Sequence, residues 1–268
     1  MAYPYWKNEM ISMIEPVKDK FRLLIDSGAF TAWKQGITID KKDYAQFIDS
    51  LTIKPWRYFS LDVIGDAIRT QENLDWFFAN GFTPTPVFQR GEDFSLLPKY
   101  AEHTGMVGIG LGVHSKGSMN YLRETMRHTN GVNVHWLGIT RPPWISYYKP
   151  YSTDSTNIWQ TRRYGRMSTY SRGRFSDWSR RGAKEKPPKK FTDLIKAIDI
   201  DPSIFQYEES WRGMYSPAQT VTARSWITYC REVERRFGTK LFLGILMPKD
   251  ISFLIDIWNW CEENETTI

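Results

Sequence analysis

Short apolar segments with the composition of β-strands alternate with helical segments along most of this chain. The predicted strands are 21–26, 57–62, 83–88, 106–111, 133–139, 151–154, 203–207 and 240–246. The predicted helices are 42–51, 70–79, 94–103, 118–128, 217–237 and 251–262. Eight strands alternating with helices within 268 residues are typical of a (β/α)8 TIM-type barrel, which is an α/β fold. A doubly wound open sheet is the alternative.

The composition predicts a globular chain with a substantial core. With 41% hydrophobic residues, disorder throughout is excluded, and we expect residues 1–268 to form one domain with a basic insertion at 160–190, after the sixth strand. No segment approaches the roughly 18 apolar residues of a membrane span. Residues 1–20 lack the apolar run of a signal peptide. We therefore predict a cytoplasmic protein without a membrane partner.

Cysteine and histidine are too sparse to indicate a metal site. Cys230 and Cys261 lie in predicted helices and are typical of small buried residues. The four histidines contain no pair at the spacing of metal ligands. We expect neither a disulfide framework nor a bound metal.

Positive charge is concentrated in residues 160–190, which hold eleven lysines and arginines against Asp177 and Glu185, in a chain whose net charge is only +6. Aromatic side chains interleave with these cations, a pattern that suits a nucleic-acid backbone with stacked or extruded bases. The predicted nucleic-acid-binding residues are Arg162, Arg163, Tyr164, Arg166, Arg172 and Arg174. A solvated loop without a ligand is the alternative.

Polar residues recur where the predicted strands end, which is the active-site face of a barrel. They are Asp26 and Ser27, Asp62, Gln89 and Asp154, while the fourth strand ends in Gly110 and Leu111. Each has a structural alternative: Asp26 and Asp154 suit turns, and Asp62 or Asp66 suits the cap of the next helix. Independent turn formers would not be expected to recur at the same end of successive strands, so the pattern favours one shared site.

Several of these segments, taken in order, resemble the motifs of a known enzyme family. They are 26–30 (Asp-Ser-Gly-Ala-Phe), 61–62, 87–91, 110–113, 136–139 and Asp154. The family is the tRNA-guanine transglycosylases (queuine tRNA-ribosyltransferases), barrel enzymes that exchange guanine for a 7-deazaguanine. The resemblance covers about residues 21–165. This chain departs from it at Ala29, at Thr31 and after Asp154, and it lacks the family's zinc subdomain. In these respects it resembles phage-encoded relatives that insert 7-deazaguanines into DNA.

The resemblance implies a role for each matched position. Asp154 would be the nucleophile that attacks C1′ and expels guanine, leaving a covalent glycosyl intermediate, with Asp26 as general acid and base. Asp62, Gln89 and Ser27, with the backbone around Gly110 and Leu111, would bind the purine.

The implied co-substrate is a 7-deazaguanine base, with no other cofactor. The expected polymer is DNA, with tRNA as the alternative. Two other hypotheses stay open: a hydrolytic N-glycosidase that uses the same carboxylates, and a non-catalytic nucleic-acid-binding barrel.

Overall fold

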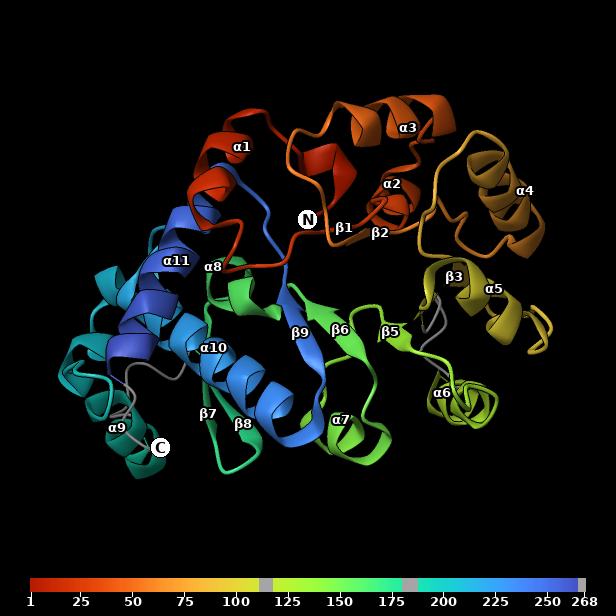
Figure 1. The fold of residues 1–268 in the computed structure, drawn as a ribbon. Coiled ribbons are helices and arrows are strands. Elements are labelled where there is room, and N and C mark those ends of the chain that lie inside the picture. Colours follow the sequence, from red (N-terminus) through yellow and green to blue (C-terminus); the bar gives the residue numbers. More distant parts are fainter. Residues whose placement is uncertain (111–117, 180–187, 265–268) are drawn as a thin grey trace. The chain divides into compact units, whose positions relative to one another are not determined.

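A computed structural model describes residues 1–110, 118–179 and 188–264 of the chain (Figure 1). The residues of the chain divide into two compact units. The first unit comprises 1–140, 150–154 and 244–248, and the second comprises 141–149, 155–243 and the residues from 249 onward. The single-domain organisation stays a prediction.

The first unit is built on parallel strands that follow one another in sequence order. They are β1 (Leu24–Ile25), β2 (Arg57–Tyr58), β3 (Val87–Phe88), β4 (Val107–Ile109), β5 (Val134–Trp136) and β6 (Ser152–Ser155). β1 pairs with β2, and β3, β4, β5 and β6 pair in that order. Between β2 and β3, a parallel bridge joins Phe59 to Thr85, and the Thr85 N–H donates to the Tyr58 carbonyl at 2.7 Å. The predicted α/β class with a mostly parallel sheet is confirmed.

One helix precedes these strands and the others lie between them, in keeping with the alternating pattern. They are α1 (Glu9–Ile14), α2 (Ala29–Gln35), α3 (Lys41–Ser50), α4 (Ala67–Ala79), α5 (Leu96–Thr104) and α6 (Ser118–Arg127). Helices α3 to α6 match predicted segments, whereas α1 and α2 are too short to show a helical period. Asp40 caps α3 by accepting the Lys42 N–H at 2.7 Å, and Asp66 caps α4 by accepting the Arg69 N–H at 3.0 Å.

The core beneath the first strands is aromatic and closely packed. Ile25, Tyr44, Leu61 and Phe77 are buried together, and the Tyr44 hydroxyl donates to the Phe59 carbonyl at 2.8 Å. A Cβ at Gly108 would lie 3.0 Å from Cε1 of the Phe59 ring. Glycine on β4 therefore gives this ring the room it occupies.

The second unit is mostly helical. Its elements are α7 (Pro142–Tyr148), η3 (Asn157–Trp159), α8 (Gln160–Tyr164), β7 (Arg166–Ser171), β8 (Arg174–Ser179), α9 (Lys189–Lys196), η5 (Pro202–Gln206), η6 (Glu208–Trp211), α10 (Pro217–Phe237) and β9 (Lys240–Leu243). Helix α11 (Pro248–Glu263) also belongs to this unit, except for its first residue, Pro248. Its core contains Met167, Trp178, Phe191, Phe205 and Trp211.

Helix α10 has the bounds that the sequence predicts. The Ser216 hydroxyl caps it by accepting the Gln219 N–H at 3.3 Å, Pro217 occupies the first turn, and Gly238 ends it at φ +70°. Within the described ranges, no helix is long and apolar enough to cross a membrane.

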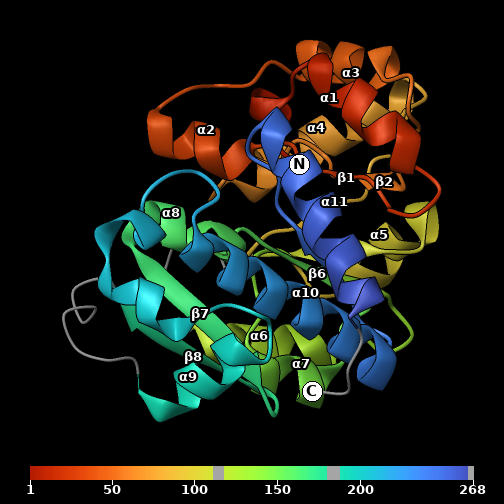
Figure 2. The ribbon, with the colours of Figure 1, turned by 90° about the vertical axis from the view of Figure 1, so that its left-hand side faces the viewer.

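One prediction about the second unit is wrong, and one pair of strands in it was not predicted. The predicted strand 203–207 is wrong, because the 3-10 helix η5 occupies this segment. Pro202 lies in its first turn and Asp201 accepts the Ser203 N–H at 2.9 Å, which starts a turn instead of a ladder. The antiparallel pair β7 and β8 was not predicted, because the apolar residues of each strand are three positions apart instead of alternating with polar ones. Figure 2 shows this hairpin beside α10, and the Ser168 N–H donates to Thr222 Oγ1 at 3.1 Å.

Candidate active site

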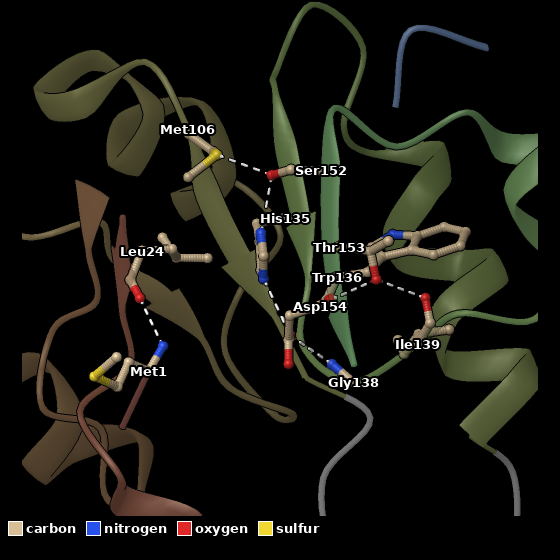
Figure 3. A network of polar contacts seen from close by, with 10 residues as sticks. All are labelled: Met1, Leu24, Met106, His135, Trp136, Gly138, Ile139, Ser152, Thr153 and Asp154. Atoms are coloured by element: carbon tan, nitrogen blue, oxygen red, sulfur yellow. Dashed lines mark hydrogen bonds and ion pairs between the residues drawn. The ribbon is translucent and has the colours of Figure 1, made fainter. Parts of the chain in front are cut away.

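β5 and β6 bring His135, Ser152 and Asp154 to one face of the sheet in the first unit (Figure 3). His135 and Ser152 are partners in the β-ladder, and Asp154 is two residues further along, so its side chain faces the same way. His135 Nε2 lies 3.2 Å from Asp154 Oδ1, and His135 Nδ1 lies 2.9 Å from Ser152 Oγ. The imidazole is fully buried, whereas the Asp154 side chain is 31% exposed. The buried ring therefore contacts the carboxylate from the protein interior and holds it in position.

The turn after β5 supplies a second support for Asp154. Gly138 adopts φ +68° and donates its N–H to Asp154 Oδ1 at 2.9 Å. Thr153 Oγ1 lies 2.9 Å from the Trp136 carbonyl and 2.7 Å from the Ile139 carbonyl, which fixes this turn against β6. Within the described parts of the chain, all hydrogen bonds to the Asp154 carboxylate involve Oδ1. This arrangement orients the carboxylate and leaves Oδ2 available.

His135 is the site residue that sequence reasoning missed. The spacing of the four histidines shows only whether a pair could bind a metal, and it does not reveal a histidine that positions another side chain. The usable signal was a polar residue between Val134 and Trp136 in an otherwise apolar strand. A buried polar side chain needs a partner, and in a parallel sheet that partner is found on the neighbouring strand.

Asp26 follows β1 directly, as predicted. Its backbone N–H donates to the Met1 carbonyl at 2.7 Å, and its carbonyl accepts the Tyr3 N–H at 2.8 Å. Burial, and next the charge of Asp154, raise the pKa of the Asp26 carboxyl, while the Met1 α-amino group and the Gly28 N–H oppose this. The hydrogen bond from the Gly28 N–H is the contact expected if Asp26 has the structural role of forming a turn. Asp26 therefore forms a local turn and also interacts with Asp154.

Asp62 is joined to two of the other predicted base-binding residues. Its Oδ1 accepts from the Ser27 hydroxyl at 3.2 Å, and its Oδ2 accepts from Gln89 Nε2 at 2.9 Å. Burial and the charge of Asp26 raise the pKa of Asp62 to about 7, against the effect of these hydrogen bonds. Since Asp66 caps α4, the capping alternative for Asp62 does not hold.

A second layer of hydrogen bonds holds Gln89 in place. The Gln89 backbone N–H donates to Glu92 Oε2. The Tyr100 hydroxyl lies 2.6 Å from Glu92 Oε1 and 2.5 Å from Gln71 Oε1. The pKa of Glu92 is raised by burial. Gln89 is thus anchored through its main chain as well as through its amide group.

The remaining predicted residues fall into different places. Gly110 follows β4 directly, and Leu111 lies outside the described residues. Arg162, Arg163, Tyr164 and Arg166 line a cavity of the second unit, whereas Arg172 and Arg174 lie at the hairpin turn between β7 and β8. In the described ranges, no three His, Cys, Asp or Glu side chains are grouped so that they could hold a metal ion.

No family model matches the chain, and neither the curated proteins nor the solved structures give a match. The chemistry of the site itself is therefore the basis for its function.

Proposed function

We propose that this protein is a nucleic-acid guanine transglycosylase that acts on DNA and takes a 7-deazaguanine base as co-substrate. One observation carries the proposal: three carboxyl groups of the first unit form a linked electrostatic set. The charge of Asp154 raises the pKa of Asp26, and the charge of Asp26 raises that of Asp62. Carboxyl groups perturbed by burial and by one another are typical of sites that transfer protons.

Asp154 is suited to the nucleophilic step. Its Oδ1 is held by Gly138 and His135, so Oδ2 can attack C1′ of the target nucleotide. The new bond joins Oδ2 to C1′, and the bond from C1′ to the guanine nitrogen breaks through an oxocarbenium-like state. The product of this half-reaction is a glycosyl ester on Asp154 and a free guanine.

Asp26 is suited to proton transfer. Its raised pKa favours the protonated form, which can donate a proton to the departing guanine. The resulting carboxylate then removes the ring N–H proton of the incoming base. That nitrogen attacks C1′, the ester bond breaks, and Asp154 returns to its free carboxylate.

Asp62 and Gln89 are suited to reading the purine edge. A carboxylate accepts from the N–H and amino donors of guanine, and Gln89 holds the Asp62 carboxylate through Oδ2. A 7-deazaguanine carries the same donors, so one pair of residues can bind the outgoing and the incoming base.

A closed (β/α)8 barrel is part of the proposal. The parallel strands β1 to β6 follow one another in sequence order, without the reversal that marks a doubly wound sheet, which supports a barrel. We also propose a cytoplasmic location, on the sequence evidence.

Release of labelled guanine tests the function and its alternatives. Purified protein is incubated with guanine-labelled double-stranded DNA, single-stranded DNA and tRNA, with and without candidate 7-deazaguanines. We expect release from DNA that requires an added base. Release from tRNA alone would show that tRNA is the substrate instead of DNA. Release without an added base would indicate a hydrolase. No release from any polymer would contradict the proposal.

A second experiment tests the covalent step. When the incoming base is withheld, we expect the wild type to form a protein–DNA adduct that survives denaturant, and Asp154→Asn to form none. Asp49→Asn, an exposed carboxylate on α3, makes the same chemical change away from the site and should form the adduct normally. An adduct formed by Asp154→Asn would remove Asp154 from this role.

A further inference from the structure

An arginine-lined cavity of about 1060 Å³ lies within the second unit. Its walls come from α8, from the start of β7 and the end of β8, and from the segment after η6. Arg162, Arg163, Arg166 and Arg212 line it, and the lining contains no acidic residue among the described ones. The volume is slightly above the range of about 300–1,000 Å³ that is usual for small-ligand sites, so there is room for more than one small group.

Local structure brings these arginines together. Gly165 ends α8 at φ +60° and turns the chain directly into β7, so Arg163 and Arg166 stand on either side of one turn. Arg166 pairs with Ser179 in the hairpin, which brings the end of β8 to the same wall. Gly213, at φ +88°, turns the segment that carries Arg212.

Arg162 is a fixed wall of the cavity. Its Nη1 lies 3.0 Å from Oδ1 of Asp250, which is fully buried, and its guanidinium carbon lies 4.7 Å from the centre of the Trp159 ring. A buried carboxylate therefore balances the charge of this arginine. Arg162 shapes the site more than it attracts a ligand.

The other three arginines are available to an anion. Within the described parts of the chain, Arg163 has no ion-pair partner. Arg166 lies 3.8 Å from Asp177, and Arg212 lies 2.7 Å from Glu208, both in exposed pairs. Exposed pairs are worth at most about 1 kcal/mol, so a phosphate can replace either carboxylate at little cost.

Two apolar groups border these cations. Tyr164 is 73% exposed, and Met214 is 37% exposed. Exposed aromatic rings are platforms on which bases stack, and a thioether packs against ring edges. The cavity thus combines anion-binding forks with a surface for a base.

We propose that this cavity binds a phosphodiester segment of single-stranded DNA. Guanidinium forks of Arg163, Arg166 and Arg212 hold the phosphates, and an unpaired base lies against Tyr164 and Met214. Bases in a duplex are stacked and paired, so they cannot enter a cavity of this kind without strand opening. The choice of DNA rests on the proposed function. The proposal adds Arg212 and Met214 to the predicted interface and gives Arg172 and Arg174, outside the cavity, a smaller role.

Fluorescence anisotropy tests the proposal without any base-exchange chemistry. A labelled single-stranded oligonucleotide and its duplex are titrated with protein at several salt concentrations. For Arg163→Gln and Arg212→Gln we expect a several-fold loss of affinity for the single strand. The slope of the logarithm of the association constant against the logarithm of the salt concentration is negative. Its magnitude should decrease by about 0.7 for each phosphate that the variant no longer neutralises. Tyr164→Ala should lose about fivefold or more in affinity, with the slope unchanged.

Arg235→Gln is the matched control, because it removes one exposed cation from α10 in the same unit, outside the cavity. We expect it to keep the wild-type salt slope. Cavity variants that bind like Arg235→Gln, or a wild type that prefers the duplex, would overturn the proposal. Displacement of the oligonucleotide by a free mononucleotide at equal nucleotide concentration would also overturn the proposal. That result would mean that the cavity binds a small molecule instead of a strand.

The two proposals fail in different ways. Wild-type protein that binds the single strand through these arginines but exchanges no base supports the cavity and contradicts the transglycosylase. Base exchange by a protein whose binding is insensitive to Arg163→Gln and Arg212→Gln contradicts the cavity alone.

Discussion

Nε2 of His135 lies 3.2 Å from Oδ1 of Asp154, while Nδ1 of the same ring lies 2.9 Å from Ser152 Oγ. The imidazole thus joins a hydroxyl and a carboxylate that are two residues apart on β6. Because both ring nitrogens are engaged and the ring is fully buried, its orientation is fixed. His135 is therefore a positioning residue for Asp154.

Replacement of His135 should slow base exchange more than it weakens substrate binding. His135→Asn removes the contact with Asp154, whereas His135→Gln can place an amide N–H near the position of Nε2. A hydrogen bond to a charged group is worth about 1.5–3 kcal/mol, so we expect kcat of the asparagine variant to fall about tenfold or more with KM little changed. The glutamine variant should recover part of the rate in the same steady-state assay. Equal rates in both variants, with equal decreases in stability, would reduce His135 to a packing role.

Asp62 should make the free energy of unfolding depend on pH. Its pKa is raised from 3.8 to about 7, so between these values the folded chain holds a proton that the unfolded chain has released. The contribution of Asp62 to the free energy of unfolding is therefore greatest below about pH 4. It decreases by up to about 1.4 kcal/mol per pH unit as the pH rises, and it is lost once the pH passes 7. Asp62→Asn should flatten this part of the curve in urea unfolding across pH. Asp49→Asn should run parallel to the wild type, and a parallel curve for Asp62→Asn would contradict the assignment.

Gly108→Ala should destabilise the first unit. The new Cβ would lie 3.0 Å and 3.2 Å from two carbons of the Phe59 ring and 3.4 Å from the Pro86 carbonyl, so the ring must move. Overpacking of this kind costs about 1–3 kcal/mol. A double-mutant cycle with Phe59→Leu, measured by urea unfolding, should show that the smaller side chain recovers at least about 0.5 kcal/mol. Strictly additive effects would mean that this ring is not the obstacle.

Asp250→Ala should strongly destabilise the second unit. The fully buried carboxylate lies 3.0 Å from Arg162 Nη1 and 3.4 Å from the Tyr215 hydroxyl, so its removal leaves a largely buried cation without its carboxylate. Such changes cost about 3–5 kcal/mol. Glu124→Ala, which removes exposed contacts with Arg127 and His128, should cost no more than about 1 kcal/mol by the same urea unfolding measurement. Similar destabilisation by the two substitutions would refute the role given to Asp250.

The sequence predicted the order of elements better than their extent. The segment 21–26 was predicted as a strand, yet β1 covers only Leu24–Ile25. Neighbouring residues still form inter-strand hydrogen bonds, such as Trp56 N–H to the Leu23 carbonyl at 2.7 Å and Phe59 N–H to the Ile25 carbonyl at 3.0 Å. Composition indicates where an extended chain is buried, whereas the length of a ladder depends on its partner strand.

The candidate site was predictable where one strand end was enough to find a residue. Asp26, Asp62, Gln89 and Asp154 were predicted because each lies at the end of a predicted strand or directly after it. His135 was missed because its role depends on the register between β5 and β6, which no single segment contains. Arg212 was missed for a similar reason, since it lines the arginine cavity from a segment far along the chain from Arg163.

The two cysteines of the chain, Cys230 on α10 and Cys261 on α11, both lie in the second unit, and burial raises the pKa of both thiols. Alkylating reagents attack the thiolate, so native protein should resist labelling until these helices separate. The first unit contains no thiol and therefore does not react with such reagents. Pulse alkylation followed by intact-mass measurement would therefore report the opening rate of one half of the molecule, without any engineered probe.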